Sequence, residues 1–171
     1  YNPVILTLLL DADGAVLAVD TLIEDLTEFQ PGGWGCTSPV SSLVSVSAID
    51  RISMIDNTRR ATICVVSAPC TLTILEHFGA LGEEWSGSHV IPCKGGGYLL
   101  AGGRTVDEGP DAFLIRTDDS GELLWQQVHA WPLREDFLLA LDTTADDGFF
   151  ASGQARRAPG GYRFSAMRFT S

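Results

Sequence analysis

The chain of 171 residues is 45 % hydrophobic, which suits one folded domain with a core and excludes a disordered chain. Its 22 acidic residues outnumber the 11 basic ones and give a formal net charge of −11, which argues against a nucleic-acid partner because phosphate binding needs clustered Lys and Arg. No apolar run approaches the ~18 residues of a membrane-spanning helix, so no transmembrane segment is predicted.

The N-terminal part of the chain predicts a β-hairpin followed by an irregular loop. Residues 4–10 and 15–22 are apolar runs on either side of a turn that contains Asp and Gly, residues 11–14, which is typical of two antiparallel strands. Residues 22–29 are the best helix candidate, but the segment is too short to be stable on its own. Residues 30–42 are rich in Gly, Pro and Ser and indicate a loop inserted on one face of the scaffold.

The rest of the chain predicts more strands at short intervals. Apolar or alternating runs are separated by turns that carry Gly or Asp, which is the pattern of an all-β protein. Five pairs of strands are expected: 45–55 with 61–67, 71–77 with 83–85, 89–92 with 98–103, 113–117 with 122–128, and 137–143 with 149–153. Residues 162–170 add a last strand without a partner to follow it.

An internal repeat is the strongest signal about the fold. The runs GGGYLLAGG and DAFLIRTDDSGELLW return as DDGFFASGQ and YRFSAMRFTS, so that Gly148 follows Gly97 by 51 residues and Arg168 follows Arg116 by 52. A repeat of roughly 40–50 residues made of short strands is typical of a β-propeller blade. We therefore expect a β-propeller-like array of four-stranded antiparallel blades, about three to four in number, in an incomplete ring.

The expected single domain divides into four repeat-like units and one insertion. The units are residues 1–29, 43–88, 89–130 and 131–171, with the inserted loop at 30–42. The last unit lacks a fourth strand, and an open edge strand must be covered. Three explanations are open: N-terminal strands close the ring, the chain is a piece of a longer polypeptide, or a partner completes the blade. The chain begins at Tyr1 and not at methionine, so we expect that a leader was removed or omitted.

The run GGGYLLAGGRT…GPDAFLIRTDDSGELLWQQ resembles the repeats of bacterial secreted β-propeller proteins. Within residues 94–171, Phe113 stands where those repeats have Trp and Arg116 where they have Lys. The other matching residues are Gly96, Gly97, Tyr98, Ala101, Gly102, Asp111, Ala112, Asp118, Gly121 and Trp125. The resemblance implies that these residues are structural and that the protein is an extracytoplasmic, non-enzymatic scaffold.

The four cysteines suggest disulfides and not a metal site. Cys36, Cys64, Cys70 and Cys93 contain no CxxC pair, and the gaps between them are 28, 6 and 23 residues. Four cysteines allow three pairings, of which we favour Cys64–Cys70 with Cys36–Cys93; the alternative is that the cysteines are buried thiols. Disulfides indicate an oxidising compartment, so we expect a secreted, periplasmic or cell-surface location.

No group of residues predicts catalysis or a resident cofactor. The three histidines, His77, His89 and His129, lie in separate predicted strands, and no GxSxG nucleophile turn occurs. The acidic turns at 11–14, 118–119 and 146–147 raise the alternative of calcium. Each turn offers two or three carboxylates where calcium takes six to eight oxygens, so we favour ordinary turn chemistry and expect no cofactor.

The preferred function is a scaffold or accessory subunit that binds another protein or assembles with itself. The candidate contact residues are Trp34 and Trp131, which lie outside the spacing of the repeat, and Tyr162, Arg163 and Phe164 in the unfinished last blade. The alternative is a carbohydrate- or ligand-binding module that uses Trp34, Trp131 and the acidic loops. Trp85 and Trp125 are 40 residues apart and are expected to pack between blades.

Overall fold

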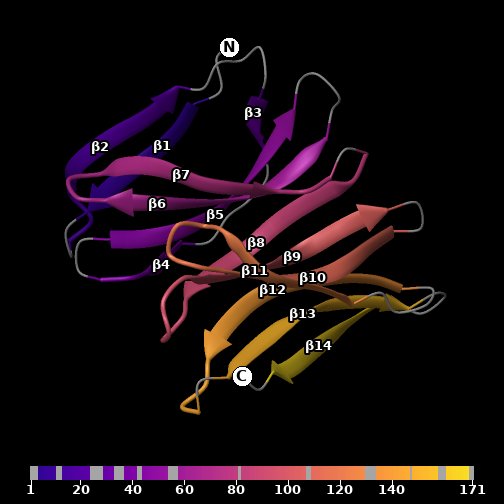
Figure 1. Ribbon diagram of the computed structural model, residues 1–171. Helices are drawn as coiled ribbons and strands as arrows, with labels where there is room; N and C mark the ends of the chain where they lie inside the picture. The colour runs from indigo at the N-terminus through magenta and orange to yellow at the C-terminus, as the bar shows by residue number, and fades with distance from the viewer. Residues whose placement is uncertain are drawn as a thin grey trace.

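The computed structural model in Figure 1 describes residues 4–10, 13–23, 29–32, 37–41, 44–53, 58–80, 82–106, 109–129, 134–146, 148–157 and 161–169. All regular structure in these residues is β-strand, which confirms the prediction of an all-β protein. Accordingly, they contain no helix long and apolar enough to cross a membrane.

The described strands form four antiparallel sheets in chain order, and none of them closes into a barrel. The N-terminal hairpin consists of β1 (Val4–Leu10) and β2 (Val16–Ile23). The second sheet has five strands: β3 (Phe29–Gly32), β4 (Thr37–Pro39), β5 (Val44–Ser53), β6 (Arg59–Ser67) and β7 (Thr71–Phe78). The third sheet has four: β8 (Glu84–Pro92), β9 (Tyr98–Val106), β10 (Gly109–Thr117) and β11 (Leu123–His129). The C-terminal sheet has three: β12 (Arg134–Thr143), β13 (Phe149–Arg157) and β14 (Tyr162–Phe169).

The strand β8 corrects one sequence prediction. Residues 83–85 were expected to pair with 71–77, but Glu84–Pro92 is one strand that pairs with β9 in the third sheet. The run Ser86-Gly87-Ser88 hides this strand because its small polar residues look like a turn. A Cβ on Gly87 would lie 3.3 Å from both Ala61 and Leu100, so the small residue lets the second sheet approach the third.

The predicted inserted loop is partly strand. β3 pairs with the second half of β5, from Ser53 to Asp50, and β4 pairs with its first half, from Ser47 to Ser45. Both therefore cover the edge of β5. Residues 22–29, which were considered as a helix and judged too short, are strand at both ends, because Leu22 belongs to β2 and Phe29 to β3; residues 24–28 lie outside the described residues.

The third sheet lies in the middle of the stack, between β5–β7 and β12–β14 (Figure 1), and both of its faces are buried. Alternation along β9 and β10 sends one set of side chains to each side. Leu100, Phe113 and Ile115 pack against the second sheet in one apolar cluster. Leu99 and Leu114 pack against the C-terminal sheet in another. This double burial explains why these strands are nearly continuous hydrophobic runs.

The two predicted packing tryptophans lie between sheets, as expected. Trp85 is buried in the cluster between the second and third sheets, with its ring centroid 4.9 Å from that of Phe113. Trp125 is half-buried against the cluster between the third and C-terminal sheets, with its ring centroid 6.4 Å from that of Phe149.

Two glycines in the second strands of neighbouring sheets permit close backbone approach. A Cβ on Gly102 would overlap the carbonyl oxygen of Ser86, and a Cβ on Gly153 would overlap that of Phe137. Gly102 pairs with β8 and Gly153 pairs with β12, and in both cases the register of the first strand shifts next to the glycine. The two arrangements are separated by the same 51 residues as Gly97 and Gly148.

Candidate functional site

Equivalent hairpin turns join the first and second strands of the third sheet, β8 and β9, and of the C-terminal sheet, β12 and β13. The amide of Cys93 donates to the carbonyl of Gly97 at 2.9 Å, and the amide of Thr144 donates to that of Gly148, also at 2.9 Å. The arginines of the sequence repeat reach these turns from the third strand of each sheet. Arg116 donates to the carbonyls of Gly96 and Thr117, whereas Arg168 pairs with the carboxylate of Asp146.

These contacts predict different costs for the two arginines. Arg116 is part-buried and also donates to the carbonyl of Tyr98 at 3.3 Å, so Arg116→Ala is expected to lower the free energy of unfolding by about 2 kcal/mol, the worth of a few charge-assisted hydrogen bonds. Arg168 and Asp146 are both more than half exposed, so Arg168→Ala should leave stability nearly unchanged. Urea unfolding of the two variants measures the contrast, and equal costs would contradict it.

A cavity of about 430 Å³ lies between these two turns, lined by Pro92, Cys93, Lys94, Thr143, Thr144, Ala145, Gly148 and Phe149. Burial raises the pKa of the Cys93 thiol, and the positive charge of Arg116 offsets part of that rise. The thiol is therefore protonated at neutral pH, and a thiol is a poorer nucleophile than a thiolate. Across the part of the chain that the structure describes, no group of three or more His, Cys, Asp and Glu is placed to hold a metal ion.

The three histidines take part in separate contacts. The Nδ1 atom of His77 lies 2.8 Å from the hydroxyl of Thr62. The Nδ1 atom of His89 accepts the amide of Leu141 at 2.9 Å and so links the third sheet to the C-terminal sheet. Burial lowers the pKa of His89, which keeps the ring neutral and able to accept this bond. The ring of His129 lies 5.7 Å from that of Phe169.

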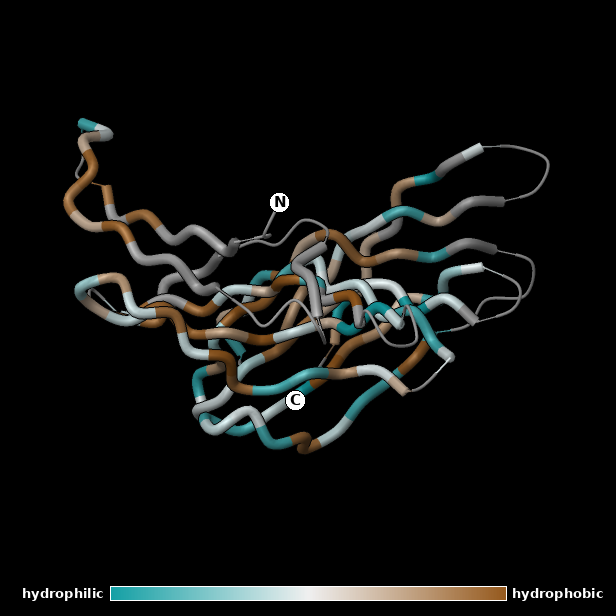
Figure 2. Tube along the Cα trace, turned by 90° about the horizontal axis from the view of Figure 1, so that it is seen from above, coloured by the Kyte–Doolittle hydropathy of each residue, from teal (hydrophilic) through white to brown (hydrophobic). Residues whose placement is uncertain are grey.

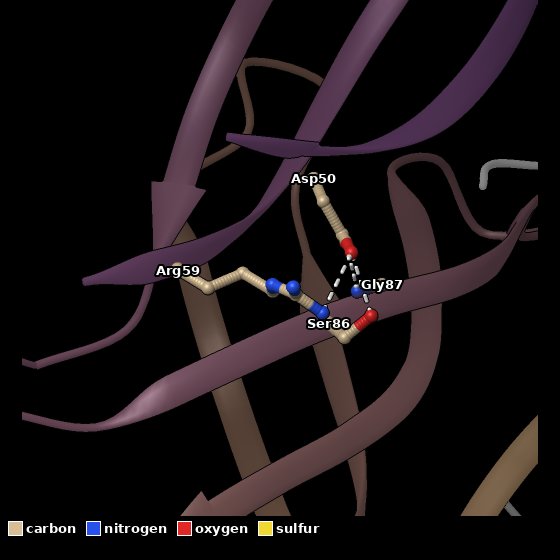
Figure 3. Close-up of polar contacts among 4 residues, drawn as sticks. All are labelled: Asp50, Arg59, Ser86 and Gly87. Atoms are coloured by element: carbon tan, nitrogen blue, oxygen red, sulfur yellow. Dashed lines mark hydrogen bonds and ion pairs between the residues drawn. The ribbon is translucent and has the colours of Figure 1, made fainter. Parts of the chain in front are cut away.

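A buried carboxylate joins the second and third sheets (Figure 3). Asp50 in β5 is 1 % exposed and accepts the hydroxyl of Ser86 at 2.7 Å and the amide of Gly87 at 2.8 Å, both in β8. A guanidinium nitrogen of Arg59 lies 4.0 Å from the same carboxylate. Burial raises the pKa of Asp50 to about 6, and these hydrogen bonds and the Arg59 charge limit the rise.

Sequence reasoning missed Asp50, although a signal was present. Val46, Ala48 and Asp50 alternate along β5, so a period of two places all three side chains on the same buried face. An acidic residue at the end of such an alternation indicates either a strand end or a buried polar contact. The structure shows the second.

The acidic turn at 118–121 uses its aspartate for the turn itself. The Asp118 carboxylate accepts the amide of Ser120 at 2.8 Å, its hydroxyl at 2.6 Å, and the amide of Glu122 at 2.9 Å. The hydrogen bond from the Ser120 side chain is the main cause that lowers the pKa of Asp118. These are the contacts expected of turn chemistry.

The predicted disulfide between Cys64 and Cys70 is not formed. Cys64 is opposite Ile74 in the ladder and its thiol donates to the carbonyl of Ser47 at 3.4 Å, while Cys70 lies in the β6–β7 turn. Three residues of strand, ~10 Å, separate Cys64 from the end of β6, and Cys70 lies in the turn beyond that end. The two Cα atoms are therefore farther apart than a disulfide allows. Cys93 is also a thiol; Cys36 lies outside the described residues, so its pairing stays a prediction.

Of the predicted contact residues, the structure brings Arg163 and Phe164 together on β14. In the described residues β14 pairs only with β13, so it is an edge strand. Arg163 is exposed, and Phe164 is 78 % exposed. The backbone of Tyr162 begins the strand, but its side chain is not described; Trp34 and Trp131 lie outside the described residues.

The outer face of the C-terminal sheet is apolar in part. Met167 and Phe169 of β14 pack inward against the third sheet, so alternate residues point outward. Phe150 and Phe164 are exposed, and the ladder places them opposite Arg168 and Gln154 respectively. Neither protein-family models nor curated protein sequences yield a match to this chain, so this edge and face are the basis for a functional proposal.

Proposed function

We propose that the sheets are blades of a β-propeller-like scaffold. The third sheet supports this, since its four antiparallel strands follow in the order β11-β10-β9-β8, a simple meander. The C-terminal sheet has the same order for its three strands and begins with the same turn hydrogen bond. Face-to-face packing of successive sheets is how propeller blades bury their cores.

The scaffold is a non-catalytic, extracytoplasmic subunit that takes up a strand of another protein molecule at β14. The observation that carries this proposal is the open edge of β14 in a sheet with one strand fewer than its neighbour. An edge strand offers a row of backbone N–H and C=O groups, which pair readily with an added strand. The exposed Phe164 provides apolar area beside that edge. The location is supported by the resemblance of residues 94–171 to secreted repeats.

Proline substitutions at adjacent positions of β14 test this edge. Successive N–H groups of a strand point to opposite sides, so one of Ser165→Pro and Ala166→Pro removes a bond to β13 and the other removes an outward donor. We expect the purified chain to associate in sedimentation velocity. The proline variant that keeps the thermal stability of the parent should be monomeric.

Two results would contradict the proposed function. One is a parent chain that stays a compact monomer at all accessible concentrations. The other is association that survives unchanged in the stable proline variant.

A further inference from the structure

We propose that the strand taken up at β14 is β1 of a second copy, so that copies join head to tail. The N-terminal hairpin of one copy then extends the C-terminal sheet of the next in the order β12-β13-β14-β1-β2. The inference rests on the proposed function of β14 as a docking edge and names the occupant of that edge. The completed sheet would have five strands, as the second sheet already has.

The two ends of the chain carry opposite charge. Residues 1–28 contain six acidic residues and no Lys or Arg. Residues 149–171 contain four Arg and no Asp or Glu. Within the C-terminal sheet the positive charge is thus confined to β13 and β14, because β12 carries three acidic residues and one Arg. We take β13 and β14 as the strands that attract the acidic N-terminal hairpin. Complementary charge raises the rate of encounter and selects the partner surface.

The N-terminal hairpin also has an unpaired strand edge and exposed apolar side chains among the described residues. The sequence of β1, VILTLLL, has no charged residue, and among the described strands β1 pairs only with β2. Leu8 and Val19 are direct neighbours across the hairpin and both are about half exposed. In Figure 2 apolar colour marks the part of this hairpin nearer its turn. A long, uncharged edge strand of this kind is normally covered.

Joining β1 to β14 would align two exposed apolar surfaces. Phe150 and Phe164 lie on the outer face of the C-terminal sheet, and Leu8 and Val19 share one face of the hairpin. In a continuous sheet these faces become one, and residues on neighbouring strands of that face contact each other. Both edges and both apolar surfaces are used in a single contact.

Within one chain the two strands lie at opposite ends of the stack. In Figure 1 the hairpin lies near β7 and the C-terminal sheet lies beyond the third sheet, and the turned view in Figure 2 keeps the two apart. The element contacts agree, since β2 touches β7 whereas β12 touches β8, β9 and β10. In the proposed contact, β14 and β1 therefore belong to two different copies.

Self-pairing of β14 is less favourable than pairing with β1. When two copies of Tyr162–Phe169 overlap fully in antiparallel register, Arg163 faces Arg168 of the other copy. Like charges that are directly opposite in a sheet destabilise the pair. Pairing of β1 with β1 would leave β14 open and bring two acidic hairpins together.

A mixing experiment tests the occupant. The stable β14 proline variant has a blocked C-terminal edge and an intact β1. A β1 variant is made in the same way, as whichever of Thr7→Pro and Leu8→Pro keeps the parent's thermal stability. Each variant alone is expected to associate at least tenfold more weakly than the parent. An equimolar mixture should form a one-to-one heterodimer, because one good interface remains. Its association should weaken as salt is raised.

The outcomes separate the two proposals. If the β14 variant loses association while the β1 variant associates as strongly as the parent, β14 remains the docking edge but β1 is not its occupant. A mixture that contains only monomers has the same meaning. Association that neither variant weakens overturns both proposals. If none of the four prolines keeps the fold, Leu10→Lys and Ala166→Lys replace them, because a lysine on an edge strand opposes pairing and the two blocked edges then repel each other, with the same outcomes.

Discussion

Gly102→Ala is expected to lower the free energy of unfolding by about 3 kcal/mol or more, because the added methyl group has no space in the core. Gly102 lies in β9 at the centre of the stack. A Cβ there would overlap the carbonyl oxygen of Ser86 and would lie 2.8 Å from the ring of Phe113. Both neighbours belong to buried or part-buried strands that pack on the second sheet, so relief requires a shift of backbone.

The matched control is Gly95→Ala, in the turn between β8 and β9. No atom lies within 4 Å of a Cβ at Gly95, and its backbone conformation is one that other residues adopt. This variant should lie within about 0.5 kcal/mol of the parent. Gly153→Ala should behave like Gly102→Ala, since its Cβ would overlap the carbonyl of Phe137. Urea unfolding measures all three, and a Gly102→Ala protein as stable as Gly95→Ala would refute the close approach.

The sequence predicted a strand correctly where apolar residues alternate with polar ones, or follow one another without a break, between two turns. β9 and β10 were predicted because both faces of the third sheet are buried and their residues are nearly all apolar. β8 was split because Gly87 and its serine neighbours are small for packing reasons and look like a turn. β3 was missed because Pro31 is a turn signal in sequence, whereas an edge strand accepts proline since it bonds on one side only.

Some features of the candidate site were likewise predictable from the sequence and others were not. The open β14 edge follows from counting strands in a repeat, which needs only sequence. The role of Arg116 was not predictable in detail, because its contacts with Gly96 and Thr117 depend on how two turns meet in space. The alternation of Val46, Ala48 and Asp50 indicates that Asp50 is buried, but its partner Ser86 is 36 residues away and leaves no local pattern.

Asp50 should make stability depend on pH in the direction opposite to that of a surface aspartate. Its pKa rises from 3.8 to about 6 on folding, so the folded protein favours the protonated carboxyl. The stability that this group contributes is complete below about pH 3.8 and is lost as pH rises through about 6. A shift of about two units corresponds to ~3 kcal/mol between those limits.

Asp50→Asn isolates that contribution, because the amide keeps the shape and an acceptor for Gly87 but does not ionise. The unfolding free energy of the variant minus that of the parent is expected to rise by about 2–3 kcal/mol between about pH 4 and pH 7.5. Asp118→Asn is the control with the reverse sign: hydrogen bonds lower the pKa of Asp118, so its stabilisation is lost as pH falls. Urea titrations between about pH 4 and pH 7.5 measure the Asp50→Asn difference, whereas the Asp118→Asn difference should stay nearly constant there and change only below about pH 3.8. A difference for Asp50→Asn that stays constant with pH would show that the buried carboxylate ionises as easily as an exposed one, and that Ser86, Gly87 and Arg59 compensate its burial fully.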